Sequence, residues 1–99
     1  MNTTRKGIDA PRILRYEVPV DGQWHDLLLT GDILHVDART PHAVEVWAWS
    51  RAAEAQPRTF RIYGDGEPIE TTGIVSHAGS VICASGWSVR HLIERTGTL

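Results

Sequence analysis

Apolar residues alternate with polar ones along most of this chain, with the period of two that is typical of β-strands. The clearest run is the segment 44–49. Its two faces are apolar on one side and acidic and aromatic on the other: Val44, Val46 and Ala48 against Glu45, Trp47 and Trp49. Such a strand has no purely solvent-facing side, so we expect its tryptophans to be covered or to bind something.

The same alternation predicts further strands between Gly- and Pro-containing turns. The predicted strands are 13–18, 24–29, 33–38, 43–50, 58–63, 74–84 and 87–95, with 74–84 as two β segments broken near Ala78-Gly79. We expect a loop at 51–56, although this segment is also compatible with one helical turn. At 89–95 the β-branched residues favour a strand over a short helix. About seven to eight short strands joined by close turns predict an all-β, antiparallel sandwich or small barrel.

Length and composition define one domain, because 99 residues cannot bury two cores. We expect a flexible arm at 1–11, a single β domain at 12–95 and a tail at 96–99. The net charge is −2 and no apolar run reaches the length of a membrane span. We expect no signal peptide, a cytoplasmic protein and no membrane partner. Nucleic-acid binding ranks last among the functions because the segment 13–50 is acidic.

Few residues indicate catalytic chemistry. The single cysteine, Cys83, lies in an apolar run and is predicted to be a buried, inert thiol. The serines near the C-terminus, which are Ser76 (beside His77), Ser80, Ser85 and Ser88, lack a nucleophile-elbow signature. His35 and Asp37 share a strand face and His42 follows a turn, which makes these three weak candidates for metal ligands. We therefore predict no catalytic residue and no cofactor.

Aromatic and arginine residues carry the remaining functional signal. If the strands 43–50 and 58–63 pair, Trp47 and Trp49 come close to Arg61 and Tyr63 and form a platform for a planar ligand or a protein partner. In a nucleotide-binding version the aromatic residues stack on a base while Arg61, Arg58 or Arg51 meets phosphate. The alternative is that the tryptophans fill a second small core under a loop, or a subunit interface.

Two motifs extend this picture: the turn Tyr63-Gly64-Asp65-Gly66-Glu67-Pro68-Ile69 and the C-terminal run His91-Leu92-Ile93-Glu94. Together with the strands at 13–18, 34–36, 44–48 and 58–63, they resemble a family of small uncharacterised proteins of tailed bacteriophages and actinobacteria, described as a domain of unknown function. The resemblance spans roughly residues 12–95. It implies a compact β domain and a phage or prophage setting, and it implies no catalytic residues.

The leading hypothesis is a non-enzymatic, phage-type binding protein, acting as a small homo-oligomer in the host cytoplasm. Its partner would be a host protein or a nucleotide-like signalling molecule. One alternative is a structural or assembly protein whose tryptophans line subunit interfaces. The other is a small metal-dependent enzyme that uses the cluster of His35, Asp37 and His42.

Overall fold

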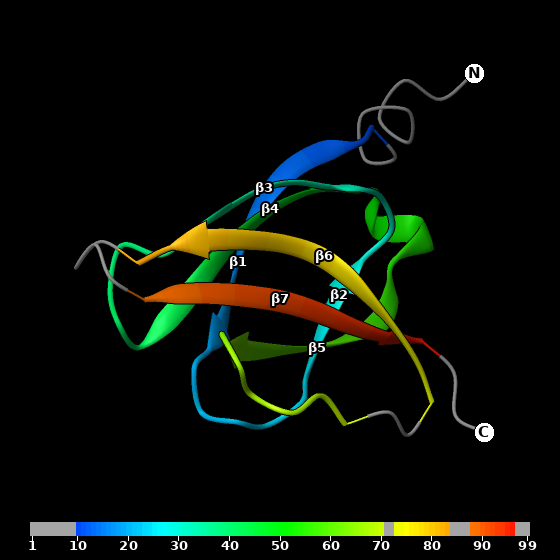
Figure 1. The fold of residues 1–99 in the computed structure, drawn as a ribbon. Coiled ribbons are helices and arrows are strands. Elements are labelled where there is room, and N and C mark those ends of the chain that lie inside the picture. Colours follow the sequence, from blue (N-terminus) through cyan, green and yellow to red (C-terminus); the bar gives the residue numbers. More distant parts are fainter. Residues whose placement is uncertain (1–9, 71–72, 84–87, 97–99) are drawn as a thin grey trace, which may run out of the picture.

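The computed structural model describes residues 10–70, 73–83 and 88–96. Within these ranges the chain forms seven strands and one short 3₁₀ turn, and no α-helix (Figure 1). In chain order the elements are β1 (Arg12–Pro19), β2 (His25–Leu29), β3 (Ile33–Asp37), β4 (Ala43–Ser50), η1 (Ala52–Glu54), β5 (Gln56–Gly64), β6 (Ile74–Ile82) and β7 (Val89–Thr96). The all-β prediction is confirmed, and the predicted loop at 51–56 contains the 3₁₀ turn.

Some predicted features lie partly or wholly outside the described residues. They are the arm up to residue 9, the turn at Ser85-Gly86 with the adjacent Trp87, and the tail from residue 97. In the ranges that are described, no helix is long and apolar enough to cross a membrane.

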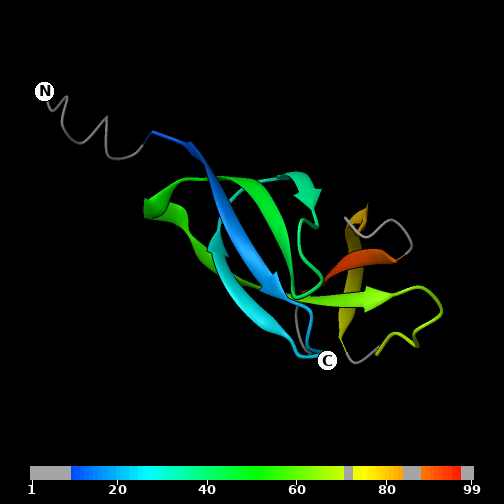
Figure 2. The ribbon, with the colours of Figure 1, turned by 90° about the vertical axis from the view of Figure 1, so that its left-hand side faces the viewer.

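The strands form two antiparallel sheets. The first sheet has the order β1-β4-β3 and the second has the order β2-β5-β7-β6. The long strand β5 pairs with β2 along its first half and with β7 along its second half. Figure 2 shows the two sheets from the side, with β1, β4 and β3 in one layer and β6 and β7 in the other. This arrangement is a small sandwich.

The strands 43–50 and 58–63 do not pair, so the condition for the aromatic platform is not met. These strands are β4 and β5, and they belong to different sheets: β4 pairs with β1 and β3, whereas β5 pairs with β2 and β7. The 3₁₀ turn and its flanking residues carry the chain from one sheet to the other instead of closing a hairpin. Strands that are neighbours in sequence are often neighbours in a sheet, but not always.

The edges of the two sheets also approach each other. On one side the Tyr16 hydroxyl of β1 donates a hydrogen bond of 3.0 Å to the Leu28 carbonyl of β2. On the other side β6 crosses β3 so closely that a Cβ atom on Gly79 would lie 2.6 Å from Val36 Cγ2. The crossing favours glycine, because any larger residue would force Val36 or the backbone to shift.

The core lies between the sheets and is built from the apolar faces that the alternation indicates. Its buried members are Val18, Leu29, Ala38, Val44, Val46, Ala48, Phe60, Ile62 and Leu92. The predicted inward face of β4, Val44, Val46 and Ala48, is confirmed, with at most 1% of each residue exposed. Cys83 is buried as predicted.

The segment 74–82 forms one strand where the sequence predicts two. The register of β6 against β7 shifts between His77 and Gly79, which marks a β-bulge at Ala78. A bulge inserts one extra residue, so the strand continues while its alternation is reset. As a result His77 and Ser80, three residues apart, both project from the outer face of the second sheet, opposite Ile93 and His91 of β7.

Candidate functional site

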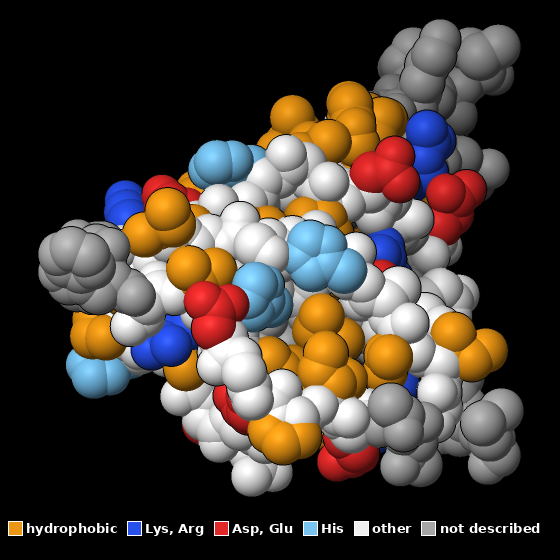
Figure 3. Space-filling view, in the orientation of Figure 1, with side chains coloured by type: hydrophobic (Ala, Val, Ile, Leu, Met, Phe, Trp, Pro, Cys, Tyr) orange, Lys and Arg blue, Asp and Glu red, His pale blue; other side chains and the backbone are white. Residues whose placement is uncertain are grey.

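A chain of four hydrogen-bonding side chains runs across the outer face of the second sheet; we call it the histidine chain. His77 Nε2 lies 2.7 Å from Ser80 Oγ, and Ser80 Oγ lies 2.7 Å from His91 Nδ1. His91 Nε2 lies 2.6 Å from Asp65 Oδ1. Figure 3 shows histidine and acidic side chains gathered on this face, beside a hollow in which hydrophobic side chains are visible.

The chemistry of the four groups determines the direction of the hydrogen bonds when both imidazoles are neutral. An ionised carboxylate only accepts, so His91 donates through Nε2–H to Asp65 and keeps a lone pair on Nδ1. Ser80 therefore donates its hydroxyl hydrogen to His91 Nδ1. The serine oxygen then accepts from His77 Nε2–H. Each imidazole is thus held in its Nε2–H tautomer.

Asp65 enters the site through the tight turn that follows β5. Gly66 has a φ of 77°, which only glycine adopts readily, and Glu67 N–H donates to the Gly64 carbonyl over 3.3 Å. The Glu67 carboxylate also accepts a 3.0 Å hydrogen bond from Gly64 N–H. The turn predicted at 64–68 is confirmed, and it places the Asp65 carboxylate beside β7.

After this turn the chain folds back over the outer face of the second sheet. Glu70 N–H donates to the Tyr63 hydroxyl over 3.2 Å, and Tyr63 becomes only 1% exposed although it points away from the main core. Trp24 packs edge-on against Tyr63, with ring centroids 6.3 Å apart. Trp24 therefore joins Tyr63 in a small aromatic cluster outside the main core.

A cavity of about 330 Å³ lies between this returning segment and the sheet; we call it the outer pocket. Its lining combines apolar side chains with part of the histidine chain: Tyr63, Ile69 and Ile93 with Asp65, Glu67, His77 and His91, completed by Gly64 and Gly66. Both histidines that contact Ser80 therefore also border the pocket. Ser80 itself is not among the lining residues, and its hydroxyl lies one hydrogen bond beyond each of the two histidines.

The aromatic platform predicted from Trp47, Trp49, Arg61 and Tyr63 is not formed. The two tryptophans lie on the outer face of the first sheet, whereas Arg61 and Tyr63 lie on the outer face of the second. The buried Tyr63 ring has no free face for a ligand, because Arg61 stacks on it with its guanidinium carbon 4.6 Å from the ring centroid.

The arginines predicted to meet phosphate already have carboxylate partners. Arg58 binds Glu94 at 2.7 Å, and this ion pair raises the pKa of Arg58. Arg61 lies 3.5 Å from Glu67 and 3.8 Å from Glu70. Arg51 lies 3.8 Å from Glu54. A phosphate group would have to displace these carboxylates.

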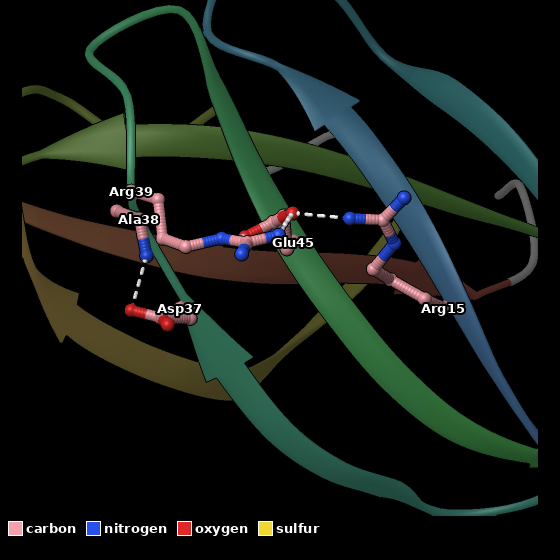
Figure 4. A network of polar contacts seen from close by, with 5 residues as sticks. All are labelled: Arg15, Asp37, Ala38, Arg39 and Glu45. Atoms are coloured by element: carbon pink, nitrogen blue, oxygen red, sulfur yellow. Dashed lines mark hydrogen bonds and ion pairs between the residues drawn. The ribbon is translucent and has the colours of Figure 1, made fainter.

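On the outer face of the first sheet, two arginines cover the Glu45 side chain of β4. Glu45 is only 5% exposed because Arg15 and Arg39 reach its carboxylate from opposite sides (Figure 4). Arg15 Nη1 lies 2.8 Å from Glu45 Oε2, and Arg39 Nε lies 2.6 Å from Oε1. The hydrogen bonds from Arg39 hold the pKa of Glu45 below its ordinary value.

The two tryptophans on this face, Trp47 and Trp49, differ in their exposure to solvent. Trp47 is half-buried, and the His35 ring lies 5.4 Å from it between centroids. Trp49 remains 41% exposed, beside its cross-strand neighbour Ile13, which is 56% exposed. The two residues form a small exposed apolar patch at one end of the first sheet.

The metal candidates do not form a metal-binding group. His35 and Asp37 lie on one face of β3, as expected, opposite Trp47 and Glu45. His42 is on the β3–β4 loop, and Asp37 accepts a 2.8 Å hydrogen bond from Ala38 N–H. Among residues 10–70, 73–83 and 88–96, no three His, Cys, Asp or Glu side chains are placed to hold a metal ion.

Sequence reasoning missed the histidine chain. A strict period of two places His77 and Ser80 on opposite faces of a strand, and only the bulge at Ala78 brings them together. The available signal was the irregularity at Ala78-Gly79, which a continuous strand accommodates as a bulge. Asp65 joins the site from a turn 26 residues before His91, a contact that no local pattern indicates.

The family model described as "Domain of unknown function (DUF7352)" matches residues 10–98. No curated protein matches the chain. No solved structure matches it either.

Proposed function

We propose that this chain, which belongs to the DUF7352 family of domains of unknown function, is a binding protein that takes a neutral or cationic, partly apolar group into the outer pocket. The observation that supports the proposal is the pocket itself, an apolar cavity bordered by the histidine chain. This keeps the binding role predicted from the sequence and moves its site from β4 to the opposite sheet.

The size and lining of the pocket suit a small ring or aliphatic group. Ligand pockets are typically clefts of roughly 300–1,000 Å³ with a mostly apolar lining and a few placed polar groups. At about 330 Å³ the outer pocket is at the lower end of that range. Ile69, which is 44% exposed, supplies the apolar contact, and the histidine chain supplies polar atoms at the pocket's border.

The charge around the pocket selects against anions. Asp65 and Glu67 both line it, and none of its lining residues in the described part of the chain is Lys or Arg. Arg61 lies 3.5 Å from Glu67, but its guanidinium is stacked on Tyr63 and also contacts Glu70. A phosphate or carboxylate group would therefore be repelled, whereas a neutral nucleobase-like ring or an aromatic cation would be accepted.

Saturation-transfer NMR with three probes of similar size tests this proposal. The probes are indole (neutral), benzamidine (cationic) and benzoate (anionic). We expect signals for indole and benzamidine and a much weaker signal for benzoate. Equal binding of benzoate would contradict the charge argument, and absence of binding by all three would contradict the pocket as a binding site.

Matched variants locate the binding. Ile69→Glu places a charge in the pocket at a residue that is 44% exposed, and Ile13→Glu makes the same change at a residue that is 56% exposed on the other sheet. We expect Ile69→Glu to abolish the indole signal and Ile13→Glu to leave it unchanged. The reverse result would place the ligand on the first sheet.

A second candidate function, self-association, is supported by a separate observation. Trp49 and Ile13 form an exposed apolar pair, and such patches commonly mark contact surfaces. Light scattering tests it: we expect Trp49→Glu to reduce the average mass at micromolar concentration, with Ile69→Glu as the control. A monomeric wild-type protein would remove this candidate.

The biological setting is also a proposal. The resemblance of the segments 63–69 and 91–94 to phage-type proteins supports a bacteriophage or prophage protein that acts in the host cytoplasm on a host protein or a small molecule. Sequencing around the gene tests the setting. Neighbouring genes for phage structural or early proteins would support it, and a purely metabolic neighbourhood would count against it.

A further inference from the structure

We propose that Ser80 is a nucleophile that accepts an acyl group from activated esters, with His91 as its general base and Asp65 as the residue that orients His91. This inference goes beyond ligand binding and does not rest on it, since a small ester can reach an exposed serine without occupying the outer pocket. The geometry of the histidine chain carries it.

The three groups meet the geometric requirement for an activated serine. A nucleophile and its base must lie within about 2.6–3.2 Å of each other, with a third group that orients the base. Ser80 Oγ and His91 Nδ1 are 2.7 Å apart, and His91 Nε2 and Asp65 Oδ1 are 2.6 Å apart. The order of the ring nitrogens is the reverse of that in the chymotrypsin-type triad, but the roles of donor and acceptor are the same.

The site is also accessible to a substrate. Ser80 is exposed, and the His91 side chain is 29% exposed. His77 and His91, which contact Ser80 from two sides, both line the outer pocket. Ser80 is not among the residues that line this pocket, so an ester reaches the serine oxygen from the exposed surface of β6, beside the two histidines.

His77 provides the donor that a developing oxyanion needs. Its Nε2 atom lies 2.7 Å from Ser80 Oγ, to which it donates when Nε2 carries the hydrogen. When Oγ bonds to the carbonyl carbon it becomes a weaker acceptor, and the same N–H can turn to the adjacent carbonyl oxygen. Removing a single donor of this kind costs on the order of 100-fold in rate in serine proteases.

The reaction balances with an ester and water alone. Ser80 Oγ attacks the carbonyl carbon and its proton passes to His91 Nδ1. The tetrahedral intermediate then expels the alkoxide or phenolate as the C–O bond to it breaks, the leaving group takes the proton from His91 Nδ1, and an acyl-Ser80 ester and a neutral His91 remain. Water hydrolyses this ester by the same steps, with His91 taking a proton from water and returning one to Ser80 Oγ.

The test uses the full chain and p-nitrophenyl acetate. We expect a burst of p-nitrophenolate that approaches one equivalent of protein, and mass spectrometry of peptides should place one acetyl group on Ser80. Ser80→Ala should abolish both. Ser76→Ala, at another exposed serine of β6 that lies opposite Glu94 and not in the histidine chain, should leave both unchanged.

The roles of Asp65 and His77 have separate readouts. Asp65→Asn should slow acetylation by at least roughly 100-fold and flatten its rise with pH, because the amide no longer fixes the His91 tautomer. His77→Ala should slow acetylation and leave the pH profile in place. Circular dichroism confirms that each variant is folded. Acetyl found on a histidine, or a burst that survives in Ser80→Ala, would overturn the proposal, as would the absence of any acetylation.

Discussion

His77 and Ser80 are three residues apart on one strand, yet they lie on the same face of the sheet and are joined by a 2.7 Å contact from Nε2 to Oγ. The β-bulge at Ala78 is responsible, since it adds one residue to β6 and reverses the alternation beyond it. Bulges are found where a strand must re-aim a side chain, often beside functional sites. The candidate site of this protein depends on that one extra residue.

The crossing of β6 over β3 should be sensitive to any added atom at Gly79. Gly79→Ala places a Cβ atom 2.6 Å from Val36 Cγ2, and we expect a loss of about 1–3 kcal/mol in the free energy of unfolding. Urea denaturation measures it. Val36→Ala should recover part of the loss in the double variant. Strict additivity of the two changes would show that the residues are not in contact.

Glu45 should stabilise the protein in a pH-dependent way. Its pKa is held below the ordinary value of 4.5, chiefly by the hydrogen bonds from Arg39, so the folded state binds this proton less readily than the unfolded state. The stabilisation is complete well above pH 4.5 and is lost as the pH falls through the lower, folded-state pKa.

Denaturation of Glu45→Gln as a function of pH checks this expectation. The variant should be less stable than the wild type at pH 7, and the difference should shrink as the solution is acidified. Glu17→Gln is the matched control, because Glu17 is exposed and lies opposite Glu45 on β1. A difference between wild type and Glu45→Gln that stays constant with pH would contradict the assignment.

The ion pair of Arg58 and Glu94 should stabilise the folded protein, and removing one partner should lower the free energy of unfolding. Arg58→Ala leaves the Glu94 carboxylate, only 10% exposed, without the guanidinium, and removes the 2.6 Å hydrogen bond to the Gly31 carbonyl. We expect a loss of about 2–3 kcal/mol, below the roughly 3–5 kcal/mol of fully buried pairs because the Arg58 side chain keeps 26% exposure.

Two further variants complete that experiment. The double change Arg58→Met with Glu94→Leu should restore most of the stability, since apolar side chains replace both charges. Arg51→Ala breaks the exposed pair with Glu54 and should cost no more than about 1 kcal/mol. Equal effects of Arg58→Ala and Arg51→Ala would show that burial does not distinguish the two pairs.

The tryptophans should differ in their access to solvent. Trp49 is 41% exposed, whereas the indole N–H of Trp24 is buried and its ring lies under Arg95, 4.3 Å from the guanidinium carbon. Acrylamide should therefore quench less of the fluorescence in Trp49→Phe than in Trp24→Phe. The opposite order would place Trp49 under cover, as in a subunit interface.

Local patterns identified the strands, and contacts between distant segments determined everything else. The alternation of Val44, Val46 and Ala48 correctly predicts the buried face of β4, because side chains on a strand alternate whatever its neighbours are. The strands that pair with β4 could not be predicted in this way, because no short-range signal distinguishes β1 and β3 from β5 as partners. The platform predicted from Trp47 and Tyr63 failed for this reason.

The site was less predictable than the fold. Ser80 and His77 looked unremarkable because the expected alternation separates them, and the bulge that unites them is visible in sequence only as an irregularity at Ala78-Gly79. Asp65 was recognised as a turn residue but not as a partner of His91. The first fact follows from the pairing of β6 with β7 and the second from the pairing of β5 with β7, and sequence patterns specify neither.

The most direct test of the account is the tautomeric state of the histidines, read from long-range ¹H–¹⁵N NMR spectra of the side chains at a pH where they are neutral. The histidine chain requires His77 and His91 each to be in the Nε2–H tautomer. The ¹⁵N chemical shift of His91 Nδ1 should also differ from that of a free imidazole, because Nδ1 accepts the Ser80 hydrogen bond, and this difference should be lost in Ser80→Ala. The exposed His42 provides the reference for an imidazole outside the chain. An Nδ1–H tautomer at His91, or a His91 spectrum like that of His42, would contradict the account.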